Sequence, residues 1–432
     1  MRRIVLSICI IGITVFEGQA VATEGGGCRT LSPDNIVSCA LRANPAVRRE
    51  QAGVQAAEGR VLAARPWVPS NPALVLTGAR RRGSAAETAT GAEPTAWNWT
   101  ATLSQELEIA GQRGARRDAA QAEVRAAQKS AVVTEREVAA LAWLRYFEVL
   151  AGEEALDLAR KLETIGARMA TVSRARADQG VLSPVEADMA EATAIALTRA
   201  RQSAQRELEQ SRAALLSLVG GDPAAETLRI EGPLAPMGSA GRATREMLAR
   251  VARTRPEVEV ARAEAQTFEA RSDVFRRARV PNPSVSIFAQ NDGFDEKVLG
   301  VGIGIPIPIP GIGRTYAGEI AEGRALSQRA AAEADRLERE FRLEAVLAAR
   351  DYESRRIELQ SFSPERLVRA DARLREMATE IELGRLAVRD AVLAQQTLIA
   401  LLRSHLEAKR ALCMASVEVV RVFGLPFDGG TK

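Results

Sequence analysis

The chain has 432 residues, enough for two or three ordinary domains, and it contains one His, four Cys and 4% aromatic residues. This composition argues against enzymes that depend on His acid–base chemistry or on metal coordination. The 59 basic and 55 acidic residues give a formal net charge of only +4, and their signs are interleaved along the sequence. Interleaved charges are typical of solvated helix faces, so no nucleic-acid partner is predicted.

The N-terminus has the three parts of an export signal. Arg2 and Arg3 form a positive region, Ile4–Phe16 is an apolar run too short to span a bilayer, and Ala20–Ala22 is an A-x-A cleavage site. We therefore predict a signal peptide over 1–22 and an exported mature protein. No later run approaches about 20 apolar residues, so no transmembrane helix is expected.

Two cysteines of the mature chain, Cys28 and Cys39, lie close together in the sequence, in what is then an oxidising compartment. A disulfide across this short loop is the first interpretation. Lipidation of Cys28 is the alternative, although glycines precede it and no Leu occupies the lipobox position. Cys413 lies on an apolar helical stripe and is interpreted as a small buried hydrophobic residue.

The strongest signal in the sequence is an internal duplication. Matching residues recur in the two halves: Pro45 and Pro256, Pro72 and Pro283, Gly180 and Gly384, and Gly220 and Gly424. The first two pairs are 211 residues apart and the last two are 204 apart. The offset between the two halves changes once, in the region of a loop between two strands, where differences in length are tolerated.

The predicted organisation is a tandem repeat with short extensions. Its expected parts are a signal peptide (1–22), an N-terminal periplasmic segment (23–43), a first repeat (44–221), a linker (222–243), a second repeat (244–424) and a C-terminal tail (425–432).

Each repeat is expected to begin with a helix at its Pro, which suits a first helical turn. Apolar residues at seven-residue spacing give this helix a coiled-coil seam, as at Val47, Val54 and Val61. Two strands follow, because apolar residues alternate with polar or small ones. The strands are expected at about 73–80 and 97–108, and at about 284–290 and 298–307.

A very long helix completes each repeat together with a returning helix. The long helices are expected at about 112–179 and 314–383, and the returning helices at about 183–219 and 388–422. Some 68 residues of helix span on the order of 100 Å. Pro364 interrupts the second long helix, where a kink or a short break is expected.

Neither the helices nor the strands are complete in one chain. A long helical hairpin needs neighbouring hairpins to bury its apolar seam. Four strands are too few to close a barrel, and a membrane-spanning sheet has to be closed so that no backbone group is left unpaired. Trp97 and Trp99 suit the aromatic girdle of an outer-membrane barrel. Three chains would supply twelve strands. A soluble hairpin that caps a coiled coil is the alternative.

The repeat and its turns resemble the TolC family of outer-membrane efflux factors over nearly the whole mature chain. The resemblance implies a mainly helical fold with a small β part. It further implies that long coiled-coil hairpins form a periplasmic α-barrel, and that a homotrimer forms a 12-stranded outer-membrane β-barrel surrounded by lipid. It also implies two periplasmic tips that contact an adaptor protein: Gly180, Val181 and Leu182, and Gly384, Arg385 and Leu386.

Six residues after each tip glycine the family commonly has an acid that lines the aperture, and here these positions are Glu186 and Asp390. A second acid often follows at the second tip, where this chain has Leu393. Both acids also suit the first turn of a helix, whose N-terminus favours negative charge.

The segment Ser104–Arg113 resembles the strand-to-helix entry of the CzcC-like branch, which serves heavy-metal efflux with an inner-membrane pump of the resistance-nodulation-division (RND) type. The implied function is passive conduction of divalent metal cations, with no enzyme activity, no cofactor and no resident metal. His405 has no ligand partner at suitable spacing and is interpreted as structural. Multidrug efflux or type I secretion through the same channel is the alternative, followed by a periplasmic coiled-coil scaffold.

Overall fold

The computed structural model describes residues 28, 30–82, 95–224, 228–243, 245–291, 297–307, 309 and 315–427. The predicted signal peptide and the end of the C-terminal tail lie outside these residues. Within the described residues, each helix lacks the length or the apolar content needed to cross a membrane.

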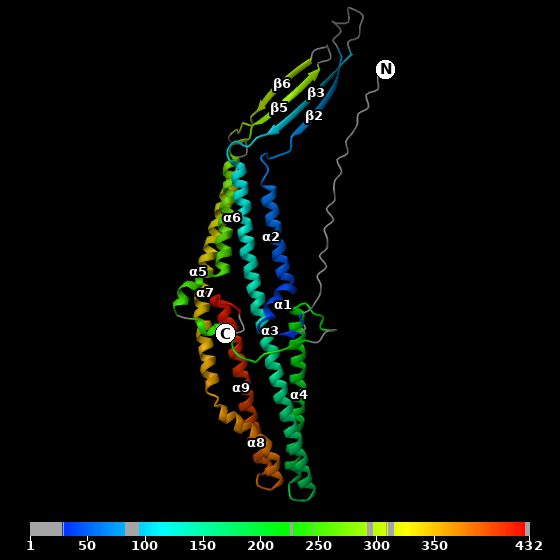
Figure 1. Cartoon of the computed structure of the whole chain (residues 1–432), viewed down its shortest axis with the longest axis vertical. Coiled ribbons are helices and arrows are strands. Elements are labelled where there is room, and N and C mark those ends of the chain that lie inside the picture. Colours follow the sequence, from blue (N-terminus) through cyan, green and yellow to red (C-terminus); the bar gives the residue numbers. More distant parts are fainter. Residues whose placement is uncertain are drawn as a thin grey trace, which may run out of the picture.

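The described chain repeats one series of elements twice (Figure 1). The first copy consists of α2 (Pro45–Ala63), β2 (Ala73–Arg82), β3 (Thr95–Glu106), α3 (Gln112–Asp178) and α4 (Pro184–Leu218). The second consists of α6 (Pro256–Ala278), β5 (Ser284–Asn291), β6 (Lys297–Gly304), α7 (Ala317–Gln360), α8 (Pro364–Glu382) and α9 (Val388–Phe423). A short helix precedes each copy: α1 (Ile36–Ala43) and α5 (Arg245–Thr254).

Local sequence signals explain where the helices begin and end. α2, α4, α6 and α8 each start with Pro, whose missing N–H costs nothing in a first turn. Asn44 caps α2 by accepting a hydrogen bond from the Ala46 backbone N–H at 2.8 Å. Gly424 directly follows α9 and has the left-handed φ of 66° that glycine adopts without strain.

The interruption predicted at Pro364 is a complete break. The helix expected over 314–383 is two helices, because α7 ends at Gln360 and α8 begins at Pro364. The predicted end of the last strand at residue 307 is also wrong. β6 ends at Gly304, and Pro306, two residues later, has no N–H with which to continue a ladder.

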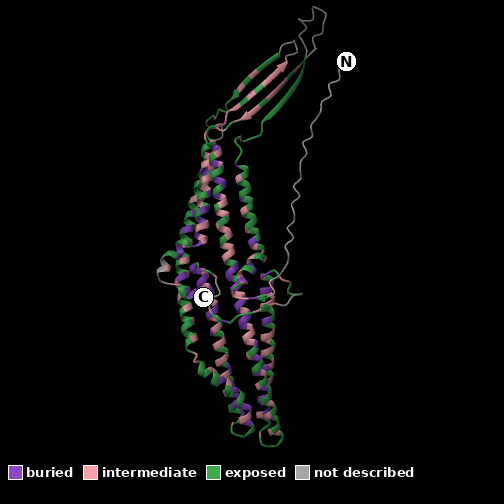
Figure 2. Ribbon diagram, in the orientation of Figure 1, coloured by how far each residue is buried: buried purple, intermediate pink, exposed green. Residues whose placement is uncertain are grey.

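The sheet joins the two copies at one end of the molecule. Its four antiparallel strands have the order β2-β3-β5-β6, so β3 of the first copy pairs with β5 of the second. The helices extend away from it in one direction, and the turns α3–α4 and α8–α9 lie together at the far end (Figure 1). Burial is concentrated between the helices rather than in the sheet (Figure 2).

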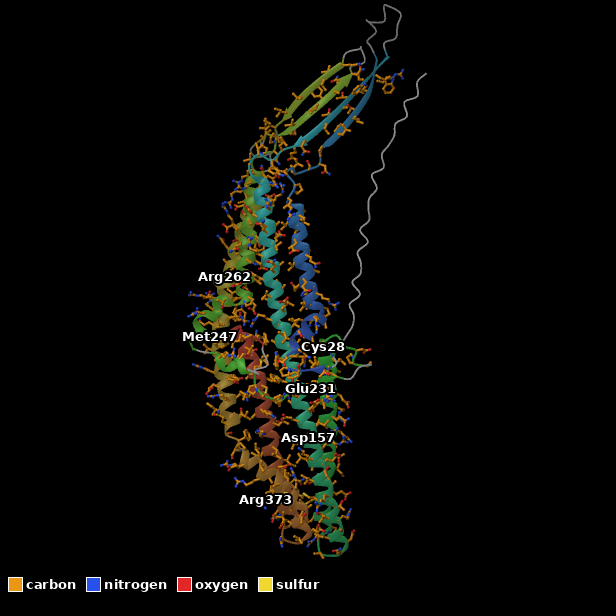
Figure 3. All side chains as sticks on the ribbon, in the orientation of Figure 1. Cys28, Asp157, Glu231, Met247, Arg262 and Arg373 are labelled. Atoms are coloured by element: carbon orange, nitrogen blue, oxygen red, sulfur yellow. A yellow bond between two sulfur atoms is a disulfide. The ribbon has the colours of Figure 1, made fainter. Side chains whose placement is uncertain are left out.

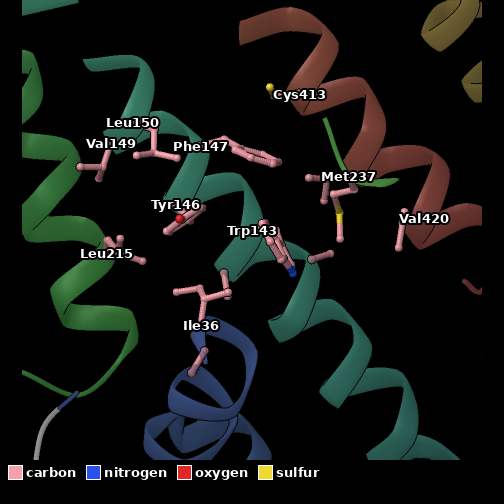
Figure 4. Close-up of a cluster of buried hydrophobic side chains, with 14 of the residues drawn as sticks. Ile36, Trp143, Tyr146, Phe147, Val149, Leu150, Leu215, Met237, Cys413 and Val420 are labelled. Atoms are coloured by element: carbon pink, nitrogen blue, oxygen red, sulfur yellow. The ribbon is translucent and has the colours of Figure 1, made fainter. Parts of the chain in front are cut away.

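The main core lies midway along the helices, where α1, α3, α4, α9 and the linker meet (Figure 4). Trp143 lies with its ring centroid 5.5 Å from that of Tyr146 and 5.3 Å from that of Phe147. The Tyr146 hydroxyl donates to the backbone oxygen of Glu231 at 2.5 Å, and burial raises its pKa to about 12. Glu231 belongs to the linker, which is therefore packed into the core.

Two short strands fix the linker to the N-terminal segment, which the sequence did not indicate. β1 (Thr30–Leu31) pairs in parallel with β4 (Arg229–Ile230). A 3-10 helix, η2 (Gly238–Arg242), follows β4. Cys28 and Glu231 both lie at this level of the molecule (Figure 3).

The structure joins Cys28 and Cys39 in a disulfide, the first of the two interpretations made from the sequence. Cys39 is buried on α1, so the bond ties the start of the described chain to the core. A Cys28 sulfur engaged in this bond is not available for lipidation.

Candidate functional site: the sheet face and the two helix tips

The strand register places apolar side chains on one face of the sheet. Leu103 on β3 lies between Leu74 on β2 and Ile287 on β5, and Ile287 faces Val301 on β6. Side chains alternate between the two faces along a strand, so every second residue of each strand, in register with these four, lies on the same face. They are Leu74, Leu76, Trp97, Trp99, Ala101, Leu103, Val285, Ile287, Ala289, Leu299, Val301 and Ile303. Trp97 and Trp99 are 69% and 48% exposed, as an interfacial position requires.

The opposite face is mainly small and polar, with Thr100, Thr102 and Ser286 among its residues. Here β6 has glycines, and Phe288 of β5 lies directly across Gly300. A Cβ added to Gly300 would lie 2.4 Å from the Phe288 ring, so a larger residue could not fit without moving this ring. The sheet therefore has one face suited to lipid and one suited to water.

Neither edge of the sheet is paired. β2 and β6 are the outer strands, and in the described residues neither has a second partner strand. Unpaired edges expose a row of backbone donors and acceptors, which is unfavourable in lipid. Further strands from other chains are needed before this sheet could lie in a membrane.

The two tip turns have the same backbone geometry. Gly180 has φ 73° and Gly384 has φ 72°, both in the left-handed region. The amides of Val181 and Leu182 donate to the oxygen of Arg176 at 3.0 and 3.2 Å. In the second turn, the amides of Arg385 and Leu386 donate to the oxygen of Glu380 at 2.9 and 3.2 Å. The predicted equivalence of the two tips thus extends to their hydrogen bonds.

The side chains at these equivalent positions differ. Arg176 donates from Nη1 to the backbone oxygens of Ile381 at 2.6 Å and Glu382 at 2.8 Å, which links α3 to the end of α8. Glu380, its counterpart, lies 3.8 Å from Arg385 within its own turn. Sequence reasoning missed this link, because an arginine among many interleaved charges gives no signal of its partner.

Both predicted aperture acids lie in first helical turns, Glu186 in α4 and Asp390 in α9. Glu186 is half-buried, and Asp390 is exposed with Arg389 at 3.8 Å. Leu393 is also exposed. These positions agree with the helix-terminus role of the acids, while their role in an aperture depends on other copies and stays a prediction.

Apolar packing supports the tips from within. A cluster of α3, α4, α8 and α9 residues includes Leu162, Met169, Leu374, Ile381 and Val392. Gln395 lies among them, fully buried, and within the described residues its amide has no hydrogen-bond partner.

The segment Ser104–Arg113 makes the joint between sheet and helices. Gln112 is buried and donates from Nε2 to Asn282 Oδ1 at 2.9 Å, and Asn282 donates from Nδ2 to Glu106 Oε1 at 2.8 Å. These three polar residues connect the first copy to the second. The polar residues of this segment therefore have a structural role at the helix–sheet junction.

Of the other residues considered from the sequence, Cys413 lies in the main core and His405 is half-buried on α9. Burial, with a smaller contribution from Lys409, lowers the pKa of His405, whose ring lies 5.5 Å from that of Phe362. Cys413 is fully buried, and burial raises its pKa to about 12. In the part of the chain that the structure describes, no three His, Cys, Asp or Glu residues are grouped to hold a metal ion.

Comparisons with known proteins agree with this geometry. Residues 36–221 match the family model described as outer membrane efflux protein. Protein CyaE of Bordetella pertussis is 31% identical over 285 residues, which is 63% of this chain and 58% of that protein. The alignment thus spans less than two thirds of the length of this relative.

Two solved structures share the fold over most of their length. One is CusC, described in the context of transmembrane channel formation, with a TM-score of 0.72, 16% identity, and coverage of 94% of this chain and 96% of that one. The other is the outer membrane protein VceC of Vibrio cholerae, with a TM-score of 0.72, 17% identity, and coverage of 91% and 96%.

The proteins that this chain resembles are channels rather than enzymes, and they do not single out the CzcC-like branch. Residues 36–221 therefore match the model of the outer membrane efflux protein family, and the chain shares the fold of CusC along 94% of its length.

Proposed function

We propose that the protein is the outer-membrane channel of a tripartite efflux system in a Gram-negative bacterium, and that it acts as a homotrimer. The observation that carries this proposal is the sheet, with one apolar face and two unpaired edges. If β6 of each copy pairs with β2 of the next, three copies form a closed sheet of twelve strands. Closure satisfies the edge backbone groups and leaves the apolar face toward lipid.

Conduction through this trimer is passive. α3 alone has 67 residues, which corresponds to about 100 Å of helix and can bridge much of the periplasm. The energy comes from an inner-membrane pump of the RND type, and a periplasmic adaptor contacts the tip turns at Gly180–Leu182 and Gly384–Leu386. Three copies of Glu186 and Asp390 form acidic rings that attract cations.

Divalent heavy-metal cations are the proposed cargo. The support is the likeness of Ser104–Arg113 to the CzcC-like branch, together with an acid, Glu186 or Asp390, in the first turn after each tip. Since the described residues hold no metal-binding cluster, metal selectivity is assigned to the pump. A channel for drugs or for secreted proteins is the competing assignment.

Two experiments test the proposal. Cell fractionation should recover the protein with the outer membrane, as a heat-modifiable trimer that resists SDS. A soluble monomer would instead support a periplasmic scaffold. A deletion strain is then challenged with zinc, cobalt, cadmium, copper and nickel beside a drug panel. Sensitivity to metals is expected, and sensitivity to drugs alone would refute the metal assignment.

A further inference from the structure

The junction between the sheet and the helices carries exposed apolar residues on its connections. Trp67 follows α2 and is 79% exposed, Ile109 precedes α3, and Ile307 follows β6 and is 81% exposed. The described parts of these connections lie at one level, between the strands and the helix ends (Figure 1). We call this set, with Ile305 and Ile309, the apolar collar.

The collar continues the apolar face of the sheet toward the helices. Val301 and Ile303 belong to this face on β6, and the alternation of Ile with Gly or Pro runs on beyond the end of β6 through Ile305, Ile307 and Ile309. These three residues are more than half exposed. The apolar surface therefore does not stop where the hydrogen-bonded sheet stops.

Three arginines lie at the edge of the collar, and each is fixed by a backbone oxygen. Arg113 donates from Nε to the Arg65 oxygen at 3.0 Å, and its guanidinium lies 3.9 Å from the centre of the Trp67 ring. Arg277 donates from Nη1 to the Ala110 oxygen at 3.1 Å. In the same way, Arg279 donates from Nε to the oxygen of Thr315 at 3.1 Å.

Each of these three guanidinium groups has N–H donors beyond the one that binds the backbone oxygen. Each has five N–H donors, of which one makes the backbone bond described above. Among the described residues, none of the three pairs with a carboxylate. The nearby acids have other partners, since Glu108 pairs with Arg116 and Asp273 with Arg276.

We propose that the collar and its three arginines bind the phosphate groups of membrane phospholipids in the leaflet that faces the helices. This inference rests on the proposed membrane position of the sheet. An exposed Trp beside an apolar band suits the boundary between hydrocarbon and headgroups. Guanidinium groups just beyond that band can each donate two parallel hydrogen bonds to a phosphate, which an ammonium group cannot.

The test uses the full-length protein, purified in mild detergent and titrated with phosphatidylglycerol, with native mass spectrometry to count lipid bound to each chain. The variant is Arg113→Gln with Arg277→Gln and Arg279→Gln, because Gln still has an N–H for the backbone oxygen. Its matched control, Arg174→Gln with Arg373→Gln and Arg389→Gln, removes three exposed charges from the hairpin ends away from the sheet.

We expect the junction variant to bind phosphatidylglycerol about tenfold more weakly than the wild type, since cationic side chains at a membrane surface attract anionic headgroups. The control should bind as the wild type does. Restoring the charge with Lys at all three positions should recover part of the binding. A diacylglycerol with the same acyl chains and no phosphate should bind equally to all variants.

Equal phosphatidylglycerol binding by the wild type and the junction variant would overturn the inference. A second outcome would also overturn it: the junction variant dissociates into monomers while each chain keeps its bound lipid. The arginines would then contact a neighbouring copy rather than a phospholipid. Fractionation and SDS-resistance of the wild type are measured in parallel. Their failure would refute the proposed function, whereas an unchanged lipid count on an intact outer-membrane trimer refutes only the lipid site.

Discussion

Arg176 on α3 donates from Nη1 to the backbone oxygen of Ile381 at the end of α8, at 2.6 Å. The two residues belong to different copies of the repeat, so this bond ties one tip turn to the other. Arg176 also donates to the backbone oxygen of Glu382 at 2.8 Å, so one side chain binds two carbonyl groups in the last turn of α8. A positive group at a helix C-terminus is favoured by the helix dipole as well.

Replacing Arg176 by Ala should loosen the second tip. The oxygens of Ile381 and Glu382 lose a charged donor, which costs about 1–2 kcal/mol locally. Hydrogen–deuterium exchange should therefore speed up in the turn that follows α8, with little change in the middle of the molecule. Arg174→Ala is the control, because Arg174 lies on the same helix and pairs with exposed Asp188 and Glu191 of α4. Equal exchange in both variants would show that the bond has no role in the turn.

Substitution of Gly384 by Asp should weaken adaptor contact while the trimer persists. The left-handed φ of 72° disfavours any side chain, at a cost of about 1–2 kcal/mol, and an added Cβ would lie 3.4 Å from the Arg176 guanidinium. A new carboxylate there would also compete for Arg176. Cross-linking to the adaptor and native electrophoresis measure the two effects separately.

Gly318→Asp is the matched control for this experiment. Gly318 lies in the first turn of α7, far from the tips, with nothing within 4 Å of an added Cβ. An acid is favourable in a first turn. Unchanged cross-linking of Gly384→Asp would refute the assignment of this turn to the adaptor.

Loss of the Cys28–Cys39 disulfide should destabilise the N-terminal segment. The cysteines are 11 positions apart, and closing a loop of this size stabilises a fold by about 2–3 kcal/mol through the unfolded chain. The Cys28→Ser, Cys39→Ser variant should therefore become more sensitive to protease near β1. A reducing agent should have this effect on the wild type and none on the variant. Intact mass then tests lipidation, since a lipid on Cys28 adds mass that the disulfide does not.

The middle of the helical part should become less stable in mild acid through His405. Its pKa is lowered in the folded protein, chiefly by burial. Because the unfolded chain then binds the proton more readily, stability falls as pH drops through the unfolded value of about 6.5. Below the folded pKa no further loss comes from this group.

His405→Gln should flatten this pH dependence, which thermal unfolding at pH 7.5 and pH 5.5 measures. The ring of Phe362 lies beside His405, so the variant is expected to be less stable at both values. The prediction is decided by how much the unfolding temperature changes between pH 7.5 and pH 5.5 in each protein. If the variant loses as much stability between these pH values as the wild type does, groups other than His405 cause the pH dependence.

Residue patterns alone predicted most of the elements and their order. The offsets between Pro45 and Pro256 and between Gly180 and Gly384 indicate the duplication. Pro364 interrupts a helix for a local steric reason, and the structure has a break at that point. The tip turns were also predictable, because a glycine that follows a long helix is itself a local signal.

Tertiary structure decided how distant residues meet. The pairing of β1 with β4, the position of β3 beside β5 and the bond from Arg176 to Ile381 join residues 178 or more positions apart. Helical and strand periods tell which face of an element is apolar, but not which other element covers it. One arginine among 59 basic residues looks like any other until the fold places a helix end beside it.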